Sequence, residues 1–179
     1  IERVVGLHAE AEAELAGDSR RARQLLHYDR TLYKEGRLST LVDDSRGAGA
    51  QWRYTTEQPP DDWAGAGFDD SGWQTGSGTF GYIEEKKGWN RDIDVVSDWD
   101  TGNIWMRIEI DVPPGGLMDY KFEVRYQCDF DAFLNGVHAA YPPQQYAIHT
   151  EFPFYPDAVA AIKPGKNVVA IHAIRNREK

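Results

Sequence analysis

Hydrophobic and polar residues alternate along much of the chain after residue 100. Over residues 104–112 an apolar side chain stands at every second position, which would place five apolar side chains on one face of a β-strand. Residues 122–128 alternate in the same way after the turn sequence Pro113-Pro114-Gly115-Gly116. The pattern therefore predicts two consecutive antiparallel strands, each of them half-buried.

Turn sequences divide the rest of this region into further strands. Asn135-Gly136 separates residues 131–134 from residues 137–140 and predicts a hairpin, because Asn-Gly accepts the two positive φ angles of a type I′ turn. Residues 146–150 predict another strand. Residues 167–175 are almost continuously apolar and are predicted to form a central strand. Several short antiparallel strands joined by turns favour a β-sandwich or a barrel.

The first 46 residues follow a helical pattern instead. Apolar residues recur at steps of three and four between Val4 and Leu15. Residues 17–19 interrupt this pattern and offer an N-cap for a second helix that would end near Gly36. We therefore expect a helical linker, or the tail of an upstream domain, over residues 1–46 and a β-sandwich over residues 47–179.

Composition and charge narrow the class of protein. The chain has 179 residues, enough for one domain with a proper core. Its 20 Lys and Arg against 29 Asp and Glu give a formal net charge of -9, which would repel a phosphate backbone, so no nucleic-acid partner is expected. No segment reaches the about 20 consecutive apolar residues that a membrane-spanning helix needs, so no membrane span is predicted. The single cysteine, Cys128, is expected to be a buried, inert thiol.

Several segments look like functional motifs but lack the context that their chemistry requires. Residues 76–81 match the letters G-x-G-x-x-G, yet no helix pattern follows them to bind a dinucleotide phosphate. Residues 98–109 imitate an EF-hand loop, but Asn103 stands where the sharp turn needs glycine. The five histidines show no metal-ligand spacing. Asp129 and Asp131 could act as a catalytic pair, or they could order the hairpin turn that follows them.

Aspartates in the loop region between residues 59 and 101 admit two interpretations. In turns, such side chains accept hydrogen bonds from neighbouring backbone N–H groups. Together with backbone carbonyls, they could also form an oxygen-rich calcium site. The residues concerned are Asp61, Asp62, Asp69, Asp70, Asp92 and Asp94. Turn formation is the commoner role, and the residues alone leave both roles open.

Aromatic and polar side chains are interleaved in two loop segments. A sugar ring has an apolar face of C–H bonds that stacks on an indole or phenol ring, while its hydroxyl groups bond to Asp, Asn or Arg. This chemistry predicts the carbohydrate-binding residues Trp89, Asn90, Arg91, Asp92, Trp99, Tyr141 and Tyr146. The alternative for any one of these rings is that it packs beneath a long loop.

The β-rich region also carries a series of motifs in a characteristic order. They are Pro59-Pro60-Asp61-Asp62-Trp63, Phe68-Asp69-Asp70-Ser71-Gly72-Trp73, Gly78-Thr79-Phe80-Gly81-Tyr82, Ile104-Trp105-Met106-Arg107, Asp131-Ala132-Phe133-Leu134-Asn135-Gly136-Val137 and Lys163-Pro164-Gly165-Lys166-Asn167-Val168-Val169-Ala170-Ile171-His172. In this order the motifs resemble the galactose-binding-domain-like jelly roll, a module that accompanies glycoside hydrolases and related secreted polysaccharide-degrading enzymes. The resemblance covers about residues 51–176. It makes Trp63, Phe68, Trp73 and Phe80 similar to the family's fold-defining core rather than to its ligand site.

The resemblance implies a mainly β, antiparallel jelly-roll sandwich beside a catalytic domain in the same parent chain. Such modules are usually non-catalytic, so no catalytic residue is assigned; a stand-alone hydrolase would need an acid and a base across a cleft. The module either holds a polysaccharide or oligosaccharide on loop aromatics, or braces a neighbouring glycosidase or sulfatase domain without binding free sugar. An extracellular or periplasmic location is also implied. Relatives often carry a structural calcium ion, but no ligand set in this sequence matches one.

Overall fold

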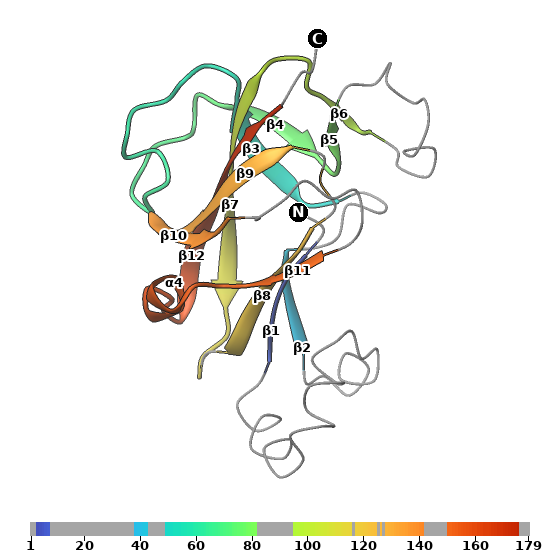
Figure 1. Cartoon of the computed structure of the whole chain (residues 1–179). Coiled ribbons are helices and arrows are strands. Elements are labelled where there is room, and N and C mark those ends of the chain that lie inside the picture. The colour runs from blue at the N-terminus through green and yellow to red at the C-terminus, as the bar shows by residue number, and fades with distance from the viewer. Residues whose placement is uncertain are drawn as a thin grey trace.

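The computed structural model describes residues 3–7, 38–42, 49–81, 95–115, 117–124, 126, 128–141 and 150–175. Two antiparallel sheets, of six and four strands, and a short parallel pair make up most of this part of the chain (Figure 1). The short helix α4, Pro156–Ala160, packs beside strand β10 of the larger sheet. Among the described residues, none belongs to a helix with the length and apolar character needed to cross a membrane.

The six-stranded sheet has the order β10-β9-β12-β7-β3-β4. Its strands are β3 Gln51–Thr55, β4 Gln74–Ser77, β7 Asn103–Val112, β9 Asp129–Leu134, β10 Val137–Ala140 and β12 Gly165–Ile174. Strand β12 pairs with β7 along its whole length and with β9 along its second half. The predicted strand over residues 104–112 and the predicted central strand near the C-terminus are therefore confirmed.

The hairpin between β9 and β10 turns at Asn135-Gly136, as predicted. Asn135 has φ 51° and Gly136 has φ 87°, and Leu134 pairs directly with Val137. Both central residues thus have the positive φ angles of a type I′ turn. A Cβ atom on Gly136 would also lie 3.3 Å from the Cα atom of Gly65, so the turn sits tightly against the loop that contains Gly65.

Two asparagine side chains join this hairpin to the turn that precedes β12. Asn167 is 1% exposed, and its Nδ2 donates to the carbonyls of Lys163 and Gly165 at 2.6 and 2.8 Å. Its Oδ1 accepts from Lys163 N at 3.1 Å and from Asn135 Nδ2 at 2.8 Å. Asn135 Oδ1 in turn accepts from Val168 N at 2.8 Å. The hairpin and the central strand therefore share one buried polar network.

The four-stranded sheet has the order β11-β8-β1-β2, with β1 Arg3–Leu7, β2 Leu38–Val42, β8 Met118–Val124 and β11 Thr150–Pro153. The predicted helix is wrong for residues 3–7, because this segment pairs with β2 on one side and with β8 on the other. Val4 and Val5 are β-branched residues that suit a strand, and tertiary pairing outweighs a weak helical pattern. The second predicted helix lies outside the described residues. Strands β1 and β2 therefore belong to this sheet, and the predicted division of the chain between residues 46 and 47 stays a prediction.

Strands β7 and β8 are consecutive in the chain but lie in different sheets. The turn between them contains Gly115 at φ 94°, and β8 then pairs with β1 and β11. The second predicted strand therefore begins earlier than expected, at Met118, and does not pair with β7. The predicted strand over residues 146–150 overlaps the described residues only at Thr150, where β11 begins.

One hydrophobic core lies between the two large sheets. Phe122 of β8 is fully buried and stacks on Phe154 with ring centroids 4.2 Å apart. Phe130 of β9 contacts Phe152 of β11 edge to face, which joins the two sheets directly. The larger sheet contributes Trp52, Ile104, Met106, Ile110, Val112, Ala132, Leu134, Val169, Ile171 and Ala173. This arrangement agrees with the predicted β-sandwich, whose jelly-roll connectivity stays a prediction.

Candidate functional site

The structure describes two of the residues that the sequence assigned to sugar binding. Tyr141 follows β10 and is 48% exposed. Trp99 is 6% exposed, and its Nε1 donates to Thr101 Oγ1 at 3.1 Å and to the Asn103 carbonyl at 3.3 Å. Trp99 is therefore a core residue whose ring is not exposed for stacking. The other five, Trp89, Asn90, Arg91, Asp92 and Tyr146, lie outside the described residues.

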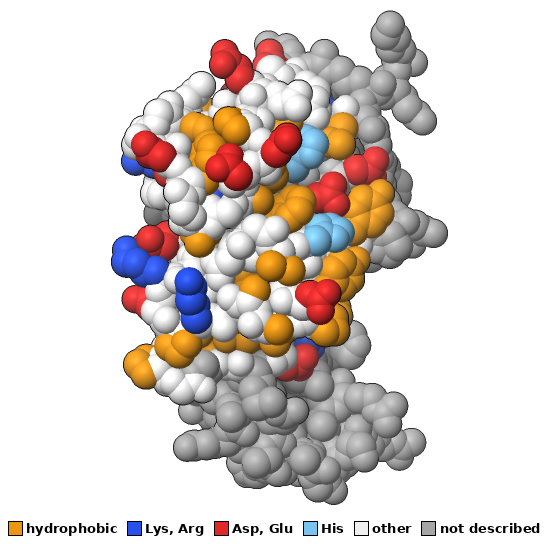
Figure 2. Space-filling view, turned by 90° about the vertical axis from the view of Figure 1, so that its left-hand side faces the viewer, with side chains coloured by type: hydrophobic (Ala, Val, Ile, Leu, Met, Phe, Trp, Pro, Cys, Tyr) orange, Lys and Arg blue, Asp and Glu red, His pale blue; other side chains and the backbone are white. Residues whose placement is uncertain are grey.

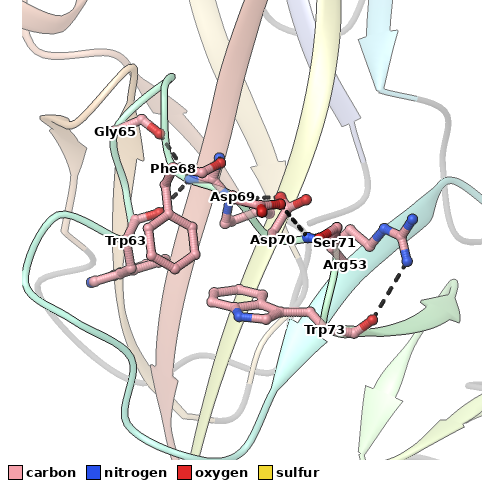
Figure 3. Close-up of polar contacts among 9 residues, drawn as sticks. Arg53, Trp63, Gly65, Phe68, Asp69, Asp70, Ser71 and Trp73 are labelled. Carbon is pink, nitrogen blue, oxygen red and sulfur yellow. Dashed lines mark hydrogen bonds and ion pairs between the residues drawn. The ribbon is translucent and has the colours of Figure 1, made fainter.

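A loop of residues 56–73 covers part of the outer face of the six-stranded sheet, the face turned away from the core. Its rings pack against one another: Trp63 and Trp73 stack at 6.5 Å, and Phe68 meets Trp73 edge to face at 5.6 Å (Figure 3). Trp63 also contacts the ring of Phe133, which stands on the outer face of β9, at 5.6 Å. These half-buried rings pack the loop against the outer face of the sheet. The fold-defining core role that the resemblance implies for Trp63, Phe68 and Trp73 stays a prediction.

Aspartates of this loop have structural partners. Asp69 Oδ1 accepts from Ser71 N at 3.0 Å (Figure 3), and this hydrogen bond lowers the pKa of the Asp69 carboxyl. Asp70 forms an ion pair with Arg107, with 2.8 Å between Oδ2 and Nε. Of the two roles that the sequence left open for the loop aspartates, turn formation agrees with the contacts of Asp69. Within the described ranges, no three His, Cys, Asp or Glu side chains are grouped so that they could hold a metal ion.

Arg107 anchors the loop to the sheet. It lies on the outer face of β7 and is only 3% exposed. Besides the ion pair with Asp70, its Nη1 donates to the carbonyls of Trp63 and Gly65, the latter at 3.1 Å, and its guanidinium lies 5.2 Å from the ring of Phe68. One charged side chain on a strand thus holds the loop at several points, because a guanidinium offers five donors in one plane.

Beside this loop, the outer face carries a partly exposed group of polar and aromatic side chains, here called the Asp131 cluster: Asp131, Phe133, His138 and Tyr155. Asp131 Oδ1 lies 3.0 Å from His138 Nε2, and these two side chains are 37% and 43% exposed. The His138 ring lies 5.4 Å from the ring of Phe133 and 5.5 Å from that of Tyr155. A carboxylate, an imidazole and two aromatic rings therefore meet at the surface.

Hairpin register and a backbone bond position the members of the Asp131 cluster. His138 pairs with Phe133 across the hairpin, and Asp131 stands two residues before Phe133 on the same face of β9. Tyr155 precedes α4, and its backbone N–H donates to the Ala139 carbonyl at 2.8 Å. The sequence offers Asp131 a site role only as a possible catalytic partner of Asp129, and it assigns Phe133, His138 and Tyr155 to no binding site. The two-residue Asn-Gly turn was the available signal, because it fixes which side chains of the hairpin share a face.

A second ring pair adjoins the cluster on the same face. The rings of Trp105 and His172 stack at 4.6 Å with their planes 4° apart, and His172 Nε2 lies 2.9 Å from Asn103 Oδ1. His172 pairs with Asp131 of the next strand. Burial lowers the pKa of His172, and the negative charge of Asp131 opposes this effect without cancelling it. His172 is therefore a neutral imidazole at pH 7.

The lowered pKa of His172 predicts an acid-dependent loss of stability. In the unfolded chain His172 takes up a proton near its ordinary pKa of 6.5, whereas the folded protein takes it up only at lower pH. The unfolded state thus binds more protons between these two values, and the free energy of unfolding falls as the pH drops below about 6.5. Denaturant unfolding at several pH values from 8 to 5 should show this fall for the wild type and a shallower one for His172→Gln. His138→Gln is the matched control, and parallel profiles for wild type and His172→Gln would contradict the prediction.

Comparison with known proteins gives matches to solved structures only. No protein-family model matches the sequence, and no curated protein matches it. A β-glucuronidase from glycoside hydrolase family 2 is 20% identical over 72% of this chain and 14% of its own, with a TM-score of 0.47. A glycosyl hydrolase family 2 member from Bacteroides cellulosilyticus is 17% identical over 72% of this chain and 17% of its own, also with a TM-score of 0.47. The Bifidobacterium dentium β-glucuronidase complexed with coumarin-3-O-glucuronide is 17% identical over 70% of this chain and 19% of its own, with a TM-score of 0.46. This chain thus spans less than a fifth of each of these glycoside hydrolases.

Proposed function

We propose that this chain is a non-catalytic accessory domain of a larger glycan-degrading enzyme, and that it holds carbohydrate on the outer face of its six-stranded sheet. The Asp131 cluster is the observation that carries the proposal. The exposed ring of Tyr155 offers an apolar surface to the C–H face of a sugar, and the neighbouring Asp131 and His138 offer hydrogen-bonding atoms to its hydroxyl groups. The motif resemblance to modules of polysaccharide-degrading enzymes supports the same function, with the extracellular or periplasmic location that it implies.

Further contacts to a polymer would come from residues around this face. Tyr141 lies three residues after His138 on the same edge of the sheet and is 48% exposed, so its ring is available to a longer chain of sugars. Trp89, Asn90, Arg91, Asp92 and Tyr146 lie outside the described residues, and their part in sugar binding stays a prediction from the sequence alone. Trp99 is left out of the proposed site because it is buried.

A second function uses part of the same surface. Val159 of α4 is 38% exposed and lies four residues after Tyr155, which is 41% exposed and receives a hydrogen bond from the backbone N–H of Val159. An exposed valine beside an exposed tyrosine suits contact with another protein surface. In this alternative the sandwich braces a neighbouring hydrolase domain of the parent chain and binds no free sugar.

Titration with polysaccharides tests the proposed function. We expect calorimetry with a panel of soluble plant, algal and host polysaccharides to detect binding, and Tyr155→Ala to weaken it at least about tenfold through loss of ring stacking. Val159→Ala is the matched control, since it shortens an exposed apolar side chain of α4 that is not a member of the Asp131 cluster. Absence of binding to every polymer by the folded wild type would contradict carbohydrate binding, as would unchanged affinity of Tyr155→Ala. Absence of polysaccharide binding, together with loss of contact between the domain and its parent enzyme in Val159→Ala, would favour the bracing function.

A further inference from the structure

The polar atoms of the Asp131 cluster are arranged to accept hydrogen bonds. An ionised carboxylate has no proton to donate, so the 3.0 Å contact of Asp131 Oδ1 requires the proton to sit on His138 Nε2. Where the imidazole is neutral, its other ring nitrogen, Nδ1, is an acceptor. The second carboxylate oxygen, Oδ2, is an acceptor as well. A ligand of this cluster must therefore supply donors, which the hydroxyl groups of a sugar do.

Two further carboxylates of the described residues stand close to the cluster in the chain. Asp129 stands two residues before Asp131 on the same face of β9, and Asp157 follows Tyr155 by two residues at the start of α4. The Arg107 guanidinium on this face is buried and paired with Asp70, Arg175 follows the residue that pairs with Asp129, and burial lowers the pKa of the stacked His172. Figure 2 shows this face, with acidic side chains around the two histidines and most of the Lys and Arg side chains toward its left-hand edge. A chain of net charge -9 adds to the negative charge of these carboxylates.

We infer that the Asp131 cluster selects uncharged sugars. This inference rests on the proposed function and names its ligand class: a neutral saccharide whose hydroxyl groups donate to Asp131 and His138. A glycan that carries carboxylate or sulfate groups brings acceptors where the site also has acceptors, and it brings negative charge close to the Asp131 carboxylate. Both effects weaken its binding, and the second depends on salt because charges at the surface are screened over about 8 Å at physiological ionic strength.

Paired polymers test the selection. The probes are a neutral β-galactan and polygalacturonate, titrated by calorimetry into the wild type at low salt and at 0.5 M NaCl. We expect the neutral polymer to bind at least about tenfold more tightly at low salt, and the difference to shrink at high salt. Asp131→Asn should reduce the difference in affinity at low salt by weakening the binding of the neutral polymer and strengthening that of polygalacturonate. The reason is that an amide donates as well as accepts hydrogen bonds and carries no charge. Thermal unfolding checks that this variant keeps the wild-type fold.

Asp111→Asn is the matched control, because it changes the net charge by the same amount at an exposed position away from the cluster: Asp111 pairs with Lys166 of β12, six positions from His172, which pairs with Asp131. It should leave the selection nearly unchanged. If it shifts the selection as much as Asp131→Asn does, net charge rather than the cluster sets the preference, and the inference is overturned. Equal or tighter binding of polygalacturonate by the wild type also overturns it, while carbohydrate binding itself stands. Absence of binding to both polymers and to the wider panel overturns the proposed function instead.

Discussion

Replacing Arg107 with alanine is expected to lower the free energy of unfolding by about 3–5 kcal/mol. The guanidinium is 3% exposed and bonds to Asp70 and to carbonyls of the covering loop. Its removal leaves the Asp70 carboxylate, which is 28% exposed, without its partner, and it leaves loop carbonyls that face the buried guanidinium without a donor. Loss of the Arg107 side chain also separates the loop from β7 in the folded protein, so less surface becomes exposed on unfolding. The free energy of unfolding should therefore fall less steeply with denaturant concentration.

Arg53 provides the matched control for this variant. It stands directly opposite Arg107 on the neighbouring strand β3, but its side chain is exposed and donates to Thr75 Oγ1 at 3.1 Å and to the Trp73 carbonyl (Figure 3). Arg53→Ala should cost far less than Arg107→Ala, because exposed polar groups exchange their protein partner for water. Urea unfolding followed by tryptophan fluorescence measures both. Equal losses for the two variants would show that Arg107 does not anchor the loop in the way described.

Asn167→Ala is expected to lower the free energy of unfolding by about 3 kcal/mol, the second-largest effect of a single substitution considered for this protein. The Asn167 side chain uses both of its polar atoms, donating to two carbonyls and accepting from Lys163 N and Asn135 Nδ2. Alanine would leave these buried groups without a partner. Asn167→Asp should also be destabilising, because a carboxylate cannot donate to the Lys163 and Gly165 carbonyls.

Lys166 is the control for the asparagine network. It precedes Asn167, and its ammonium group pairs with Glu109 at the surface, where the two side chains are 75% and 55% exposed. Lys166→Ala should change stability little, because exposed ion pairs are screened by water and salt. Equilibrium unfolding of the two variants side by side gives the comparison. A wild-type free energy of unfolding for Asn167→Ala would mean that the network contributes no net stability.

The strands that the sequence predicted well are those whose pattern is local. Residues 104–112 alternate because one face of β7 meets the core, and Asn135-Gly136 turns as predicted because few other residue pairs accept its φ angles. The last strand is apolar on both faces because the sheet core lies on one side and Ala170 and Val168 are buried on the other. In these segments the local preference and the tertiary environment agree.

The features that the sequence did not reveal depend on distant contacts. Residues 3–7 have a pattern that suits a helix, but β8 and β2 provide partners on both sides that only the folded chain brings together. Arg107 stands at a position that alternation assigns to the polar face of its strand. It is buried because a loop from earlier in the chain lies over it. Asp70 and Trp63 of this loop precede Arg107 by 37 and 44 residues. The alternation of apolar and polar residues along a strand does not show that a distant loop will cover its polar face.

The sugar-binding role of the residues named from the sequence stays a prediction, and two of them can be compared with the structure. The ring and hydroxyl-binding chemistry expected of a carbohydrate module led to Tyr141, which is exposed, and to Trp99, which is buried. Burial of a tryptophan in a loop depends on what lies above it, and one sequence does not contain that information. Hairpin register could have predicted part of the Asp131 cluster, since Asp131 and His138 flank the predicted turn. Tyr155 lies outside the hairpin and is held beside it by the backbone hydrogen bond to Ala139.

The position of β12 has a consequence for how the chain is made. This strand is synthesised after every other strand described, yet it lies between β9 and β7 in the middle of the larger sheet. On the ribosome, β3, β4 and β7 can associate, and the β9–β10 hairpin can close by itself, but the two groups stay separate until residues 165–174 emerge. Until then one edge of β7 and one edge of β9 lack their neighbour, and unpaired edges recruit other strands. Completion of this sheet therefore waits until residues 165–174 have left the ribosome, and a nascent chain stalled before residue 165 would expose unpaired strand edges that a chaperone can bind.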